Sequence, residues 1–157
     1  GVSMLKGHDS NAPVDVSSDR IELQDRADRA VFTGNVHVVQ GDLVIDAQRM
    51  NVAYTKASGG GAPQIQRIDA SGGVTVVSPS ERAQGSYGIY DLNRRLITLI
   101  GGVALVRGGN RVSGARLVID LNSGRSSVDG SAVGGANASS GGGRVTGRFT
   151  VPKRVGN

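Results

Sequence analysis

Hydrophobic and polar residues alternate along most of this chain with a period of two. Successive side chains of a β-strand point to opposite faces, so the alternation predicts strands that bury one face. Val14 and Val16 begin the pattern, and Ile21 and Leu23 continue it in the same first strand. Strands are predicted at 13–23, 30–39, 43–54, 68–76, 83–92, 96–106, 112–121 and 144–151, with turns at 41–42, 78–80, 108–110 and 122–124.

The alternation is organised in a repeat that is anchored on glycines. Gly34, Gly72 and Gly101 are 38 and 29 residues apart, and a weak fourth anchor, Gly130, follows 29 residues later. A valine stands two positions after each anchor, a small residue thirteen after it, and apolar or small residues sixteen, eighteen and twenty after it. Units this short cannot bury an apolar face alone, so they are expected to stack into one body with a continuous interior. The repeated positions are Val36, Val74 and Val103; Ala47, Gly85 and Gly114; and Met50, Val52, Tyr54, Gly88, Tyr90, Leu92, Leu117, Ile119 and Leu121.

Simple alternation places Leu43, Ile45 and Ala47 on one face of their strand. It places Met50, Val52 and Tyr54 on the other face. The small residues of the repeat are candidates for bends or bulges where the sheet curves. A flexible loop is predicted at 56–63 and a mobile glycine-rich loop at 134–143. The expected organisation is one domain over 13–152, preceded by a disordered start or cloning remnant at 1–12 and followed by a tail at 153–157.

The composition favours an all-β protein. Valine and isoleucine number 29 against 11 leucine and methionine, and there are only two glutamates, whereas helices favour leucine and glutamate. The net charge is +5, but aromatic residues make up only 3% of the chain. Platforms for single-stranded nucleic acid need exposed aromatic rings, so nucleic acid is not predicted as a partner. The absence of cysteine excludes disulfides and thiolate metal sites.

The sequence offers no candidate catalytic centre, cofactor site or metal site. The two histidines are His8, in the polar start, and His37, which alternation places on the face opposite Val36 and Val38. No serine lies in a nucleophile elbow, and the glycine clusters are not followed by a helix that would bind phosphate. The acidic residues near strand ends are expected to form turns and to face solvent; they are Asp46, Asp69, Asp91, Asp120 and Asp129. We therefore predict no enzyme activity.

A longer motif resembles a known family. The stretch 13–54 contains a proline before alternating apolar residues, the pair Ser18-Asp19, the box Phe32-Thr33-Gly34-Asn35-Val36, the turn Gln40-Gly41 and a strand that reaches Asp46-Ala47. These features are similar to the start of mature proteins of the OstA-like family. Weaker similarity extends through 99–106, 114–121 and 144–152, whereas the loop at 134–143 has no counterpart in that pattern.

The resemblance implies an antiparallel β-jellyroll of half-open stacked sheets with little or no helix. It implies a periplasmic protein that carries lipopolysaccharide from the inner to the outer membrane. The lipid A acyl chains would lie in an apolar groove, and copies would join head to tail. Proteins of the LptC and LptD type would bind at opposite ends. The alternatives are the lipid-transport domain of an LptC-type protein or of an LptD N-terminal region, and a purely structural β-stacking module with a closed core.

Alternation predicts which side chains would line such a groove. The same pattern also fits a closed sandwich core. The groove is expected to be partly open, so that cargo is released as well as held. Four arginines near strand ends are weaker candidates for contacts with lipid phosphates at the rim, namely Arg20, Arg82, Arg107 and Arg116. The groove candidates are Phe32, Val36, Val38, Leu43, Ile45, Met50, Val52, Val74, Val76, Tyr90, Leu99, Val103, Leu105, Val112, Leu117, Ile119 and Leu121.

Overall fold

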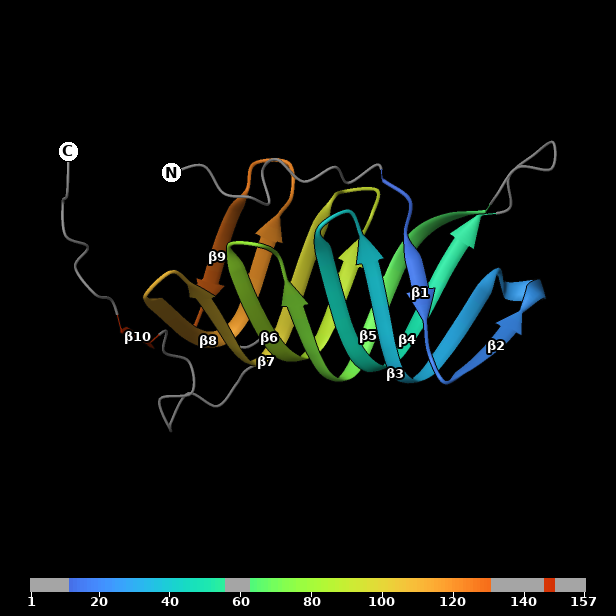
Figure 1. The fold of residues 1–157 in the computed structure, drawn as a ribbon, viewed down its shortest axis with the longest axis horizontal. Helices are drawn as coiled ribbons and strands as arrows, with labels where there is room; N and C mark the ends of the chain where they lie inside the picture. The colour runs from blue at the N-terminus through green and yellow to red at the C-terminus, as the bar shows by residue number, and fades with distance from the viewer. Residues whose placement is uncertain (1–11, 56–62, 131–145, 149–157) are drawn as a thin grey trace.

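The computed structural model describes residues 12–55, 63–130 and 146–148, which form one antiparallel sheet of ten strands (Figure 1). Six long strands, β3 to β8, follow one another in the sheet, and each pairs with the next one along the chain. Short strands lie at both ends of the sheet: β1 and β2 pair with β3, and β9 and β10 pair with β8. A single 3₁₀ turn, Asp25–Ala27, interrupts the β structure of the described residues. The predicted all-β jellyroll is confirmed. The strands are β1 (Asp15–Ser17), β2 (Arg20–Gln24), β3 (Arg29–Gln40), β4 (Leu43–Thr55), β5 (Gln64–Val77), β6 (Glu81–Asp91), β7 (Leu96–Arg107), β8 (Asn110–Asp120), β9 (Arg125–Asp129) and β10 (Thr146–Arg148).

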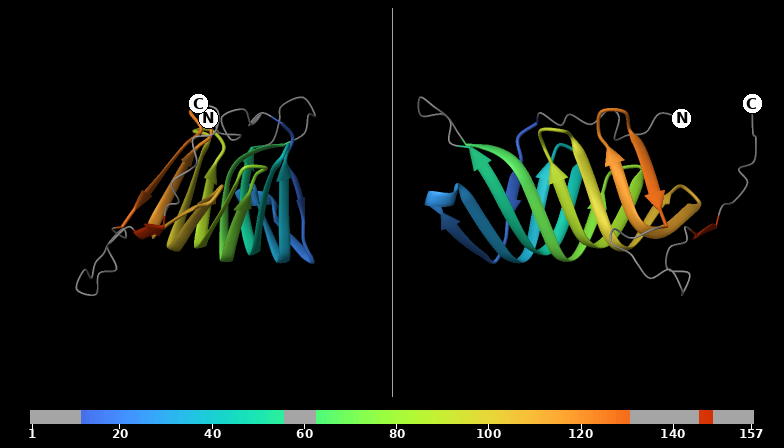
Figure 2. Two further views of the ribbon diagram at one scale, coloured as in Figure 1. Left: turned by 60° about the vertical axis from the view of Figure 1, so that its left-hand side comes forward. Right: turned by 180° about the vertical axis from the view of Figure 1, so that it is seen from behind.

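Bulges fold this sheet back on itself. In β3, β5 and β7 two residues oppose a single residue of the next strand, which is the geometry of a β-bulge and makes a strand bend. The three glycine anchors are the first residues of these bulges. Their φ angles are 85°, 83° and 87°, in the left-handed region that glycine adopts without strain. The bends lie along the lower edge of the body in Figure 1, and Figure 2 shows them from two further sides.

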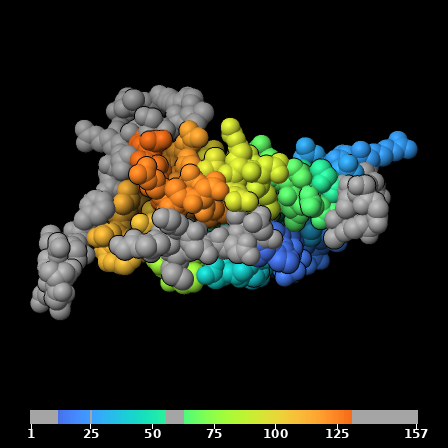
Figure 3. Space-filling view, turned by 90° about the horizontal axis from the view of Figure 1, so that it is seen from above, coloured from blue at the N-terminus to red at the C-terminus, as the bar shows by residue number. Residues whose placement is uncertain are grey.

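The bends divide the sheet into two arms that face each other across the core. The side of the body away from the bends, where the turns of both arms lie, is called the mouth below. In Figure 3 the colours run from blue at one end of the body to orange at the other, so successive segments of the chain follow one another along its long axis. Arm A contains β2, β9 and residues 29–33, 49–55, 64–71, 87–91, 96–100 and 116–120; arm B contains β1, β10 and residues 36–40, 43–47, 74–77, 81–85, 103–107 and 110–114.

The bulges also change which residues point inward. In β4 the register shifts between Asp46 and Arg49, so Leu43 in arm B and Met50 in arm A both point into the core. The prediction that the two halves of β4 use different faces is therefore wrong. Strict alternation fails here because β4 bends where it pairs with the bulges of β3 and β5, and its Gln48 and Arg49 are both exposed.

The first predicted strand, 13–23, is also corrected, because it is two strands. β1 pairs with arm B of β3, whereas β2 pairs with arm A, so this edge must follow β3 around its bend. Asp19 lies at that corner: its backbone N–H donates to the carbonyl of Gly34 at 2.9 Å, and its Oδ2 accepts a hydrogen bond from Asn35 at 3.0 Å.

Most of the predicted turns are confirmed, and one strand was missed. The chain reverses at 41–42, 78–80 and 121–124, and the turn predicted at 108–110 is shorter because Asn110 already begins β8. β9 was not predicted, since its sequence RSSVD has a single apolar residue. The last predicted strand, 144–151, is described only as β10. The loop predicted at 134–143 lies outside the described residues, as does the loop predicted at 56–63 except for Pro63. The described residues contain no helix that is long and apolar enough to cross a membrane.

Candidate functional site

The inner face of the bent sheet is a continuous apolar surface. Because directly paired residues of neighbouring strands point to the same side, the register shows which side chains form a row. Two rows cross arm A from β2 to β9, and each is apolar along nearly its whole length. One row is Ile21, Phe32, Met50, Ala70, Gly88, Leu99, Leu117 and Val128; the other is Leu23, Ala30, Val52, Ile68, Tyr90, Ile97, Ile119 and Ser126.

The predicted groove residues lie on this inner face. All of them are buried except Phe32 and Val112, which are half-buried, and Phe32 packs against the core. The prediction omitted Ile68, Ala70 and Ile97, which belong to the same core. Alternation within each strand was the signal that could have found them, because Ile68 and Ala70 alternate with Val74 and Val76 in β5, and Ile97 alternates with Leu99 in β7.

The two arms pack against each other, so the interior is closed at its centre. Met50, Leu99 and Leu117 have no exposed surface. Between the arms remains a narrow cavity of about 10 Å³, lined by apolar side chains that include Ile45 of arm B and Ile97 of arm A. This volume is about that of one water probe, far below the volume of an acyl chain. A lipid therefore enters this interior only if the arms move apart.

The small residues of the repeat are explained by crowding inside the bends. A Cβ atom added to Gly114 would lie 2.6 Å from Cγ1 of Val128 and 2.7 Å from the carbonyl oxygen of Asp129. A Cβ added to Gly85 would lie 3.1 Å from the Cβ of Leu99. Each small residue pairs with the valine that follows a bulge, as Gly114 does with Val103. The glycine and its valine together fill the corner where the arms meet.

One polar pair lies inside this apolar core. The hydroxyl of Tyr90, in arm A of β6, donates a hydrogen bond of 2.6 Å to Oε1 of Gln40, the last residue of β3 in arm B. Both side chains are almost fully buried. Burial raises the pKa of Tyr90 to about 12, because the charged phenolate would lose its hydration. The amide of Gln40 also donates to the backbone carbonyl of Ala12 at 3.0 Å.

The two ends of the apolar surface differ. At the β2 end, Ile21 and Leu23 continue the inner rows, yet they are 53% and 62% exposed. At the β9 end, Val128 packs against the core and the second row finishes at Ser126. Among the described strands, β1 and β2 pair only with β3, and β9 and β10 only with β8. Within the part of the chain that the structure describes, each end of the sheet therefore presents a strand edge with no further strand paired to it, and such an edge can template another strand.

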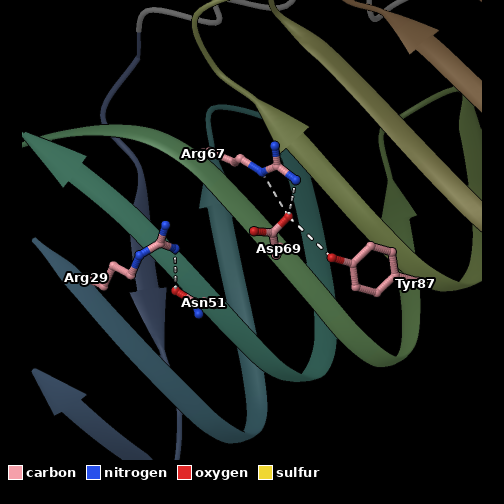
Figure 4. A network of polar contacts seen from close by, with 5 residues as sticks. All are labelled: Arg29, Asn51, Arg67, Asp69 and Tyr87. Carbon is pink, nitrogen blue, oxygen red and sulfur yellow. Dashed lines mark hydrogen bonds and ion pairs between the residues drawn. The ribbon is translucent and has the colours of Figure 1, made fainter. Parts of the chain in front are cut away.

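The outer face carries polar contacts in place of a core. His37 and Asp46 pair across β3 and β4 with 2.5 Å between Nδ1 and Oδ1, on the face opposite Val36, as predicted. That pair lies in arm B; in arm A, Asp69 accepts hydrogen bonds from Arg67 at 3.0 Å and from the hydroxyl of Tyr87 at 3.4 Å (Figure 4). The hydrogen bond to Asp69 and its negative charge raise the pKa of Arg67, and burial followed by the same negative charge raises the pKa of Tyr87.

The four rim arginines do not form one cluster. Arg82 and Arg107 lie on neighbouring strands at the turn end of arm B, but their side chains point to opposite faces, because Arg107 pairs with Glu81 and Arg82 with Val106. Arg107 forms an ion pair of 2.9 Å with Glu81. Arg20 and Arg116 lie in arm A close to the bends, at opposite ends of the sheet. A contact with lipid phosphates at the mouth thus remains a proposal for Arg82 and Arg107, and the register gives the other two no position there.

Two of the acidic residues near strand ends have the turn-forming role that was expected. Oδ1 of Asp91 accepts the backbone N–H of Arg94, and Oδ1 of Asp120 accepts those of Asn122 and Ser123. Across the described residues, no three His, Cys, Asp or Glu side chains are grouped so that they could hold a metal ion.

Comparison with known proteins places this architecture in a family. Residues 15–125 match the model described as LptA/(LptD N-terminal domain) LPS transport protein. The chain belongs to this family. The family consists of lipopolysaccharide transport proteins and is not an enzyme family, and the LptA-like, OstA-like resemblance of the sequence is confirmed.

Individual relatives agree with this assignment. An uncharacterized protein of Rhizobium meliloti (strain 1021) is 37% identical over 125 residues, which are 76% of this chain and 67% of that protein. The LPS-assembly protein LptD of Yersinia enterocolitica is 28% identical over 92 residues; these are 59% of this chain but only 11% of LptD. The crystal structure of LptH, the LptA-homologous periplasmic component of the lipopolysaccharide transport device of Pseudomonas aeruginosa, superposes with a TM-score of 0.75 at 19% identity. That superposition covers 92% of this chain and 99% of LptH, and at this identity it shows a shared fold.

Proposed function

We propose that this protein is a periplasmic carrier of lipopolysaccharide that bridges the inner and outer membranes and binds the acyl chains of lipid A on the inner face of its bent sheet. The observation that carries the proposal is the pair of apolar rows that cross arm A and continue to the exposed side chains of Ile21 and Leu23. A soluble domain rarely leaves two large aliphatic side chains exposed at the end of its own core unless something covers them. Family membership supports lipopolysaccharide as the cargo.

The energetics require the arms to open and close around the cargo. Burying one methylene group is worth about 0.8 kcal/mol, so an acyl chain placed between the arms would be held strongly. Closing the arms on one another recovers the same kind of burial when the chain leaves. The competition between lipid and self-packing keeps net affinity moderate, as a carrier needs. In the described residues this chain shows no nucleotide-binding loop, so the proposal assigns the driving energy to other components.

Photo-crosslinking at positions on the inner and the outer face of the sheet tests whether lipopolysaccharide is the cargo. A photo-reactive residue at Val36 or Ile119, both on the inner face, is expected to crosslink lipopolysaccharide. The same residue at His37, on the outer face, is the matched control and is expected to crosslink little. Equal labelling at Val36 and His37 would contradict the groove assignment.

We further propose that copies join head to tail, with the β1–β2 end of one copy meeting the β9–β10 end of the next. The unpaired edges at both ends can accept another strand, and the difference between the ends makes the contact heterologous. Partners of the same fold, of the LptC and LptD types, would use these ends in the same manner. Contacts of this kind do not close on themselves, so they produce particles that lengthen with concentration.

Removal of residues 144–151 tests the assembly proposal, because it deletes β10 and frees arm B of β8. Small-angle scattering over a concentration series is expected to show growth for the complete chain and none for the truncated one. The double variant Ile21→Ser/Leu23→Ser probes the opposite end without shortening the chain. A truncated chain that still lengthens with concentration would remove β10 from the contact.

Two other functions each have one observation in their favour. The match to LptD favours a role as the N-terminal domain of a larger outer-membrane protein. The mass of the native protein in an envelope fraction, detected with an antibody to this chain, distinguishes that role from a free-standing bridge. The cavity of only about 10 Å³ favours a purely structural module with a closed core. Absence of inner-face crosslinking to lipopolysaccharide would support that module.

A further inference from the structure

The Gln40–Tyr90 pair joins the two arms at the mouth. Gln40 ends β3 in arm B, directly before the turn at 41–42, and Tyr90 is the penultimate residue of β6 in arm A. Their hydrogen bond of 2.6 Å therefore connects strand ends that separate when the arms open. Through the bond from Gln40 to the carbonyl of Ala12, the segment before β1 is tied to the same point.

Polar groups are rare in this interior. The buried polar or charged residues of the described chain are Gln40, Ser78 and Glu81, and the last two lie at the turn between β5 and β6. Tyr90, by contrast, lines the apolar cavity together with Ile68 and Ile97. A Phe at 90 would fill the same volume, so packing of the apolar core alone gives no reason for the hydroxyl of Tyr90.

We propose, on the basis of the proposed carrier function, that Gln40 and Tyr90 are specificity-determining residues that exchange their mutual hydrogen bond for bonds to the polar linkage at the head of an acyl chain. An acyl chain enters only when the arms part, and parting breaks the bond between the two side chains. The phenol is then left in an apolar site without its acceptor, unless the ligand supplies one, whereas the amide of Gln40 has a second partner in the carbonyl of Ala12. A buried polar group without a hydrogen bond is strongly disfavoured, so the pair selects against bare hydrocarbon.

The recognised chemical class is an amphiphile whose chain begins with an ester, amide or hydroxyl group. Such a group accepts a hydrogen bond from the Tyr90 hydroxyl, and an amide or hydroxyl also donates to Gln40 Oε1. The depth of the pair supports this match. Gln40 lies at the mouth end of arm B and Tyr90 at the mouth end of arm A, where the apolar interior meets the mouth. The head of a bound chain would lie at this level.

Three variants and two probes test the inference. Tyr90→Phe removes the hydroxyl. Tyr90→Phe/Gln40→Met replaces the whole pair by apolar groups of similar volume, so neither side chain of the pair is left without the other, and the carbonyl of Ala12 loses its bond to Gln40. Tyr87→Phe removes a hydroxyl from the outer face and is the matched control. The probes are dodecanoyl sucrose, whose chain begins with an ester, and dodecyl maltoside, whose chain begins with an ether, each used below its micelle concentration to displace fluorescent lipopolysaccharide.

The unmodified protein and Tyr87→Phe are expected to favour the ester probe by roughly tenfold, which corresponds to one buried hydrogen bond. The preference is expected to fall to near unity in the double variant, with Tyr90→Phe in between. An unchanged preference in the double variant, or an equal loss in Tyr87→Phe, would overturn the inference while leaving the carrier function intact. Failure of the unmodified protein to bind lipopolysaccharide would instead overturn the carrier function, and this inference with it.

Hydrogen exchange without any lipid provides a separate check of the connection between the arms. Tyr90→Phe is expected to speed amide exchange at the end of β3 and the end of β6, and Tyr87→Phe is not. Unchanged exchange in Tyr90→Phe at both strand ends would show that the bond does not hold the arms together, and would overturn the inference.

Discussion

Leu117 and Val118 are neighbours on β8, yet they belong to two different environments. Leu117 points inward, has no exposed surface and stands in a row that crosses the whole sheet. Val118 points outward, is half-buried and pairs with Thr98 and Ser127. The inner face is thus continuous from strand to strand, whereas the outer face is a series of local polar contacts. A continuous surface can pass a long apolar molecule along, as the proposed carrier function requires, and a set of isolated pairs cannot.

Truncating one side chain on each face gives the largest expected contrast. Leu117→Ala removes buried methyl groups and leaves a cavity, so it is expected to lower the free energy of unfolding by about 2–5 kcal/mol. Val118→Ala on the outer face is expected to lower it by less than about 1 kcal/mol. Denaturant titration of both variants measures the contrast. Equal losses would show that the outer face is as tightly packed as the inner one.

The two tyrosines of β6 allow the same comparison at high pH. The folded state raises the pKa of Tyr90 from its ordinary value of 10.0 to about 12, so between these values the unfolded chain releases a proton that the folded chain keeps. The stabilising contribution of Tyr90 is fully present below pH 10 and is lost as the pH rises toward 12. The loss is about 2–3 kcal/mol, at roughly 1.4 kcal/mol per pKa unit.

Tyr90→Phe is therefore expected to flatten the alkaline part of the stability curve, as followed by urea unfolding at a series of pH values. Tyr87→Phe also removes a tyrosine with a raised pKa, but on the outer face, and is expected to flatten it less. A larger effect from Tyr87 than from Tyr90 would show that the inner tyrosine is better hydrated than its burial indicates.

The smallest expected effect concerns His37 and Asp46. Although their side chains pair directly across β3 and β4, both are about half exposed, and such pairs contribute less than about 1 kcal/mol. A double-mutant cycle with His37→Ala and Asp46→Ala measures the coupling energy. A coupling of several kcal/mol would mean that polar pairs on the outer face also contribute substantially to the free energy of unfolding.

Much of the fold was predictable because the repeat keeps the same residue type at the same place in each unit. Val36, Val74 and Val103 stand after bulges, and all are buried as predicted. The small residues opposite them mark the bends, as expected. The inward set was recovered because alternation within each arm is regular.

The errors arose where position along the chain does not determine position in space. The break at Ser18-Asp19 is imposed by the bend of β3, to which that edge must conform. β9 has little apolar signal because it covers the end of the sheet with a single inner valine. The Gln40–Tyr90 bond joins residues 50 positions apart and depends on how the arms cross, which no local pattern encodes.

The central claim, that the inner face carries the acyl chains to the end of the sheet, is tested most directly at β2. Ile21, Glu22 and Leu23 are all exposed, so a photo-reactive residue at each disturbs no core packing. Only Ile21 and Leu23 continue the inner rows; Glu22 points to the other face. Crosslinking to lipopolysaccharide at 21 and 23 but not at 22 is the predicted result. Equal crosslinking at all three positions, or at 22 alone, would contradict the account.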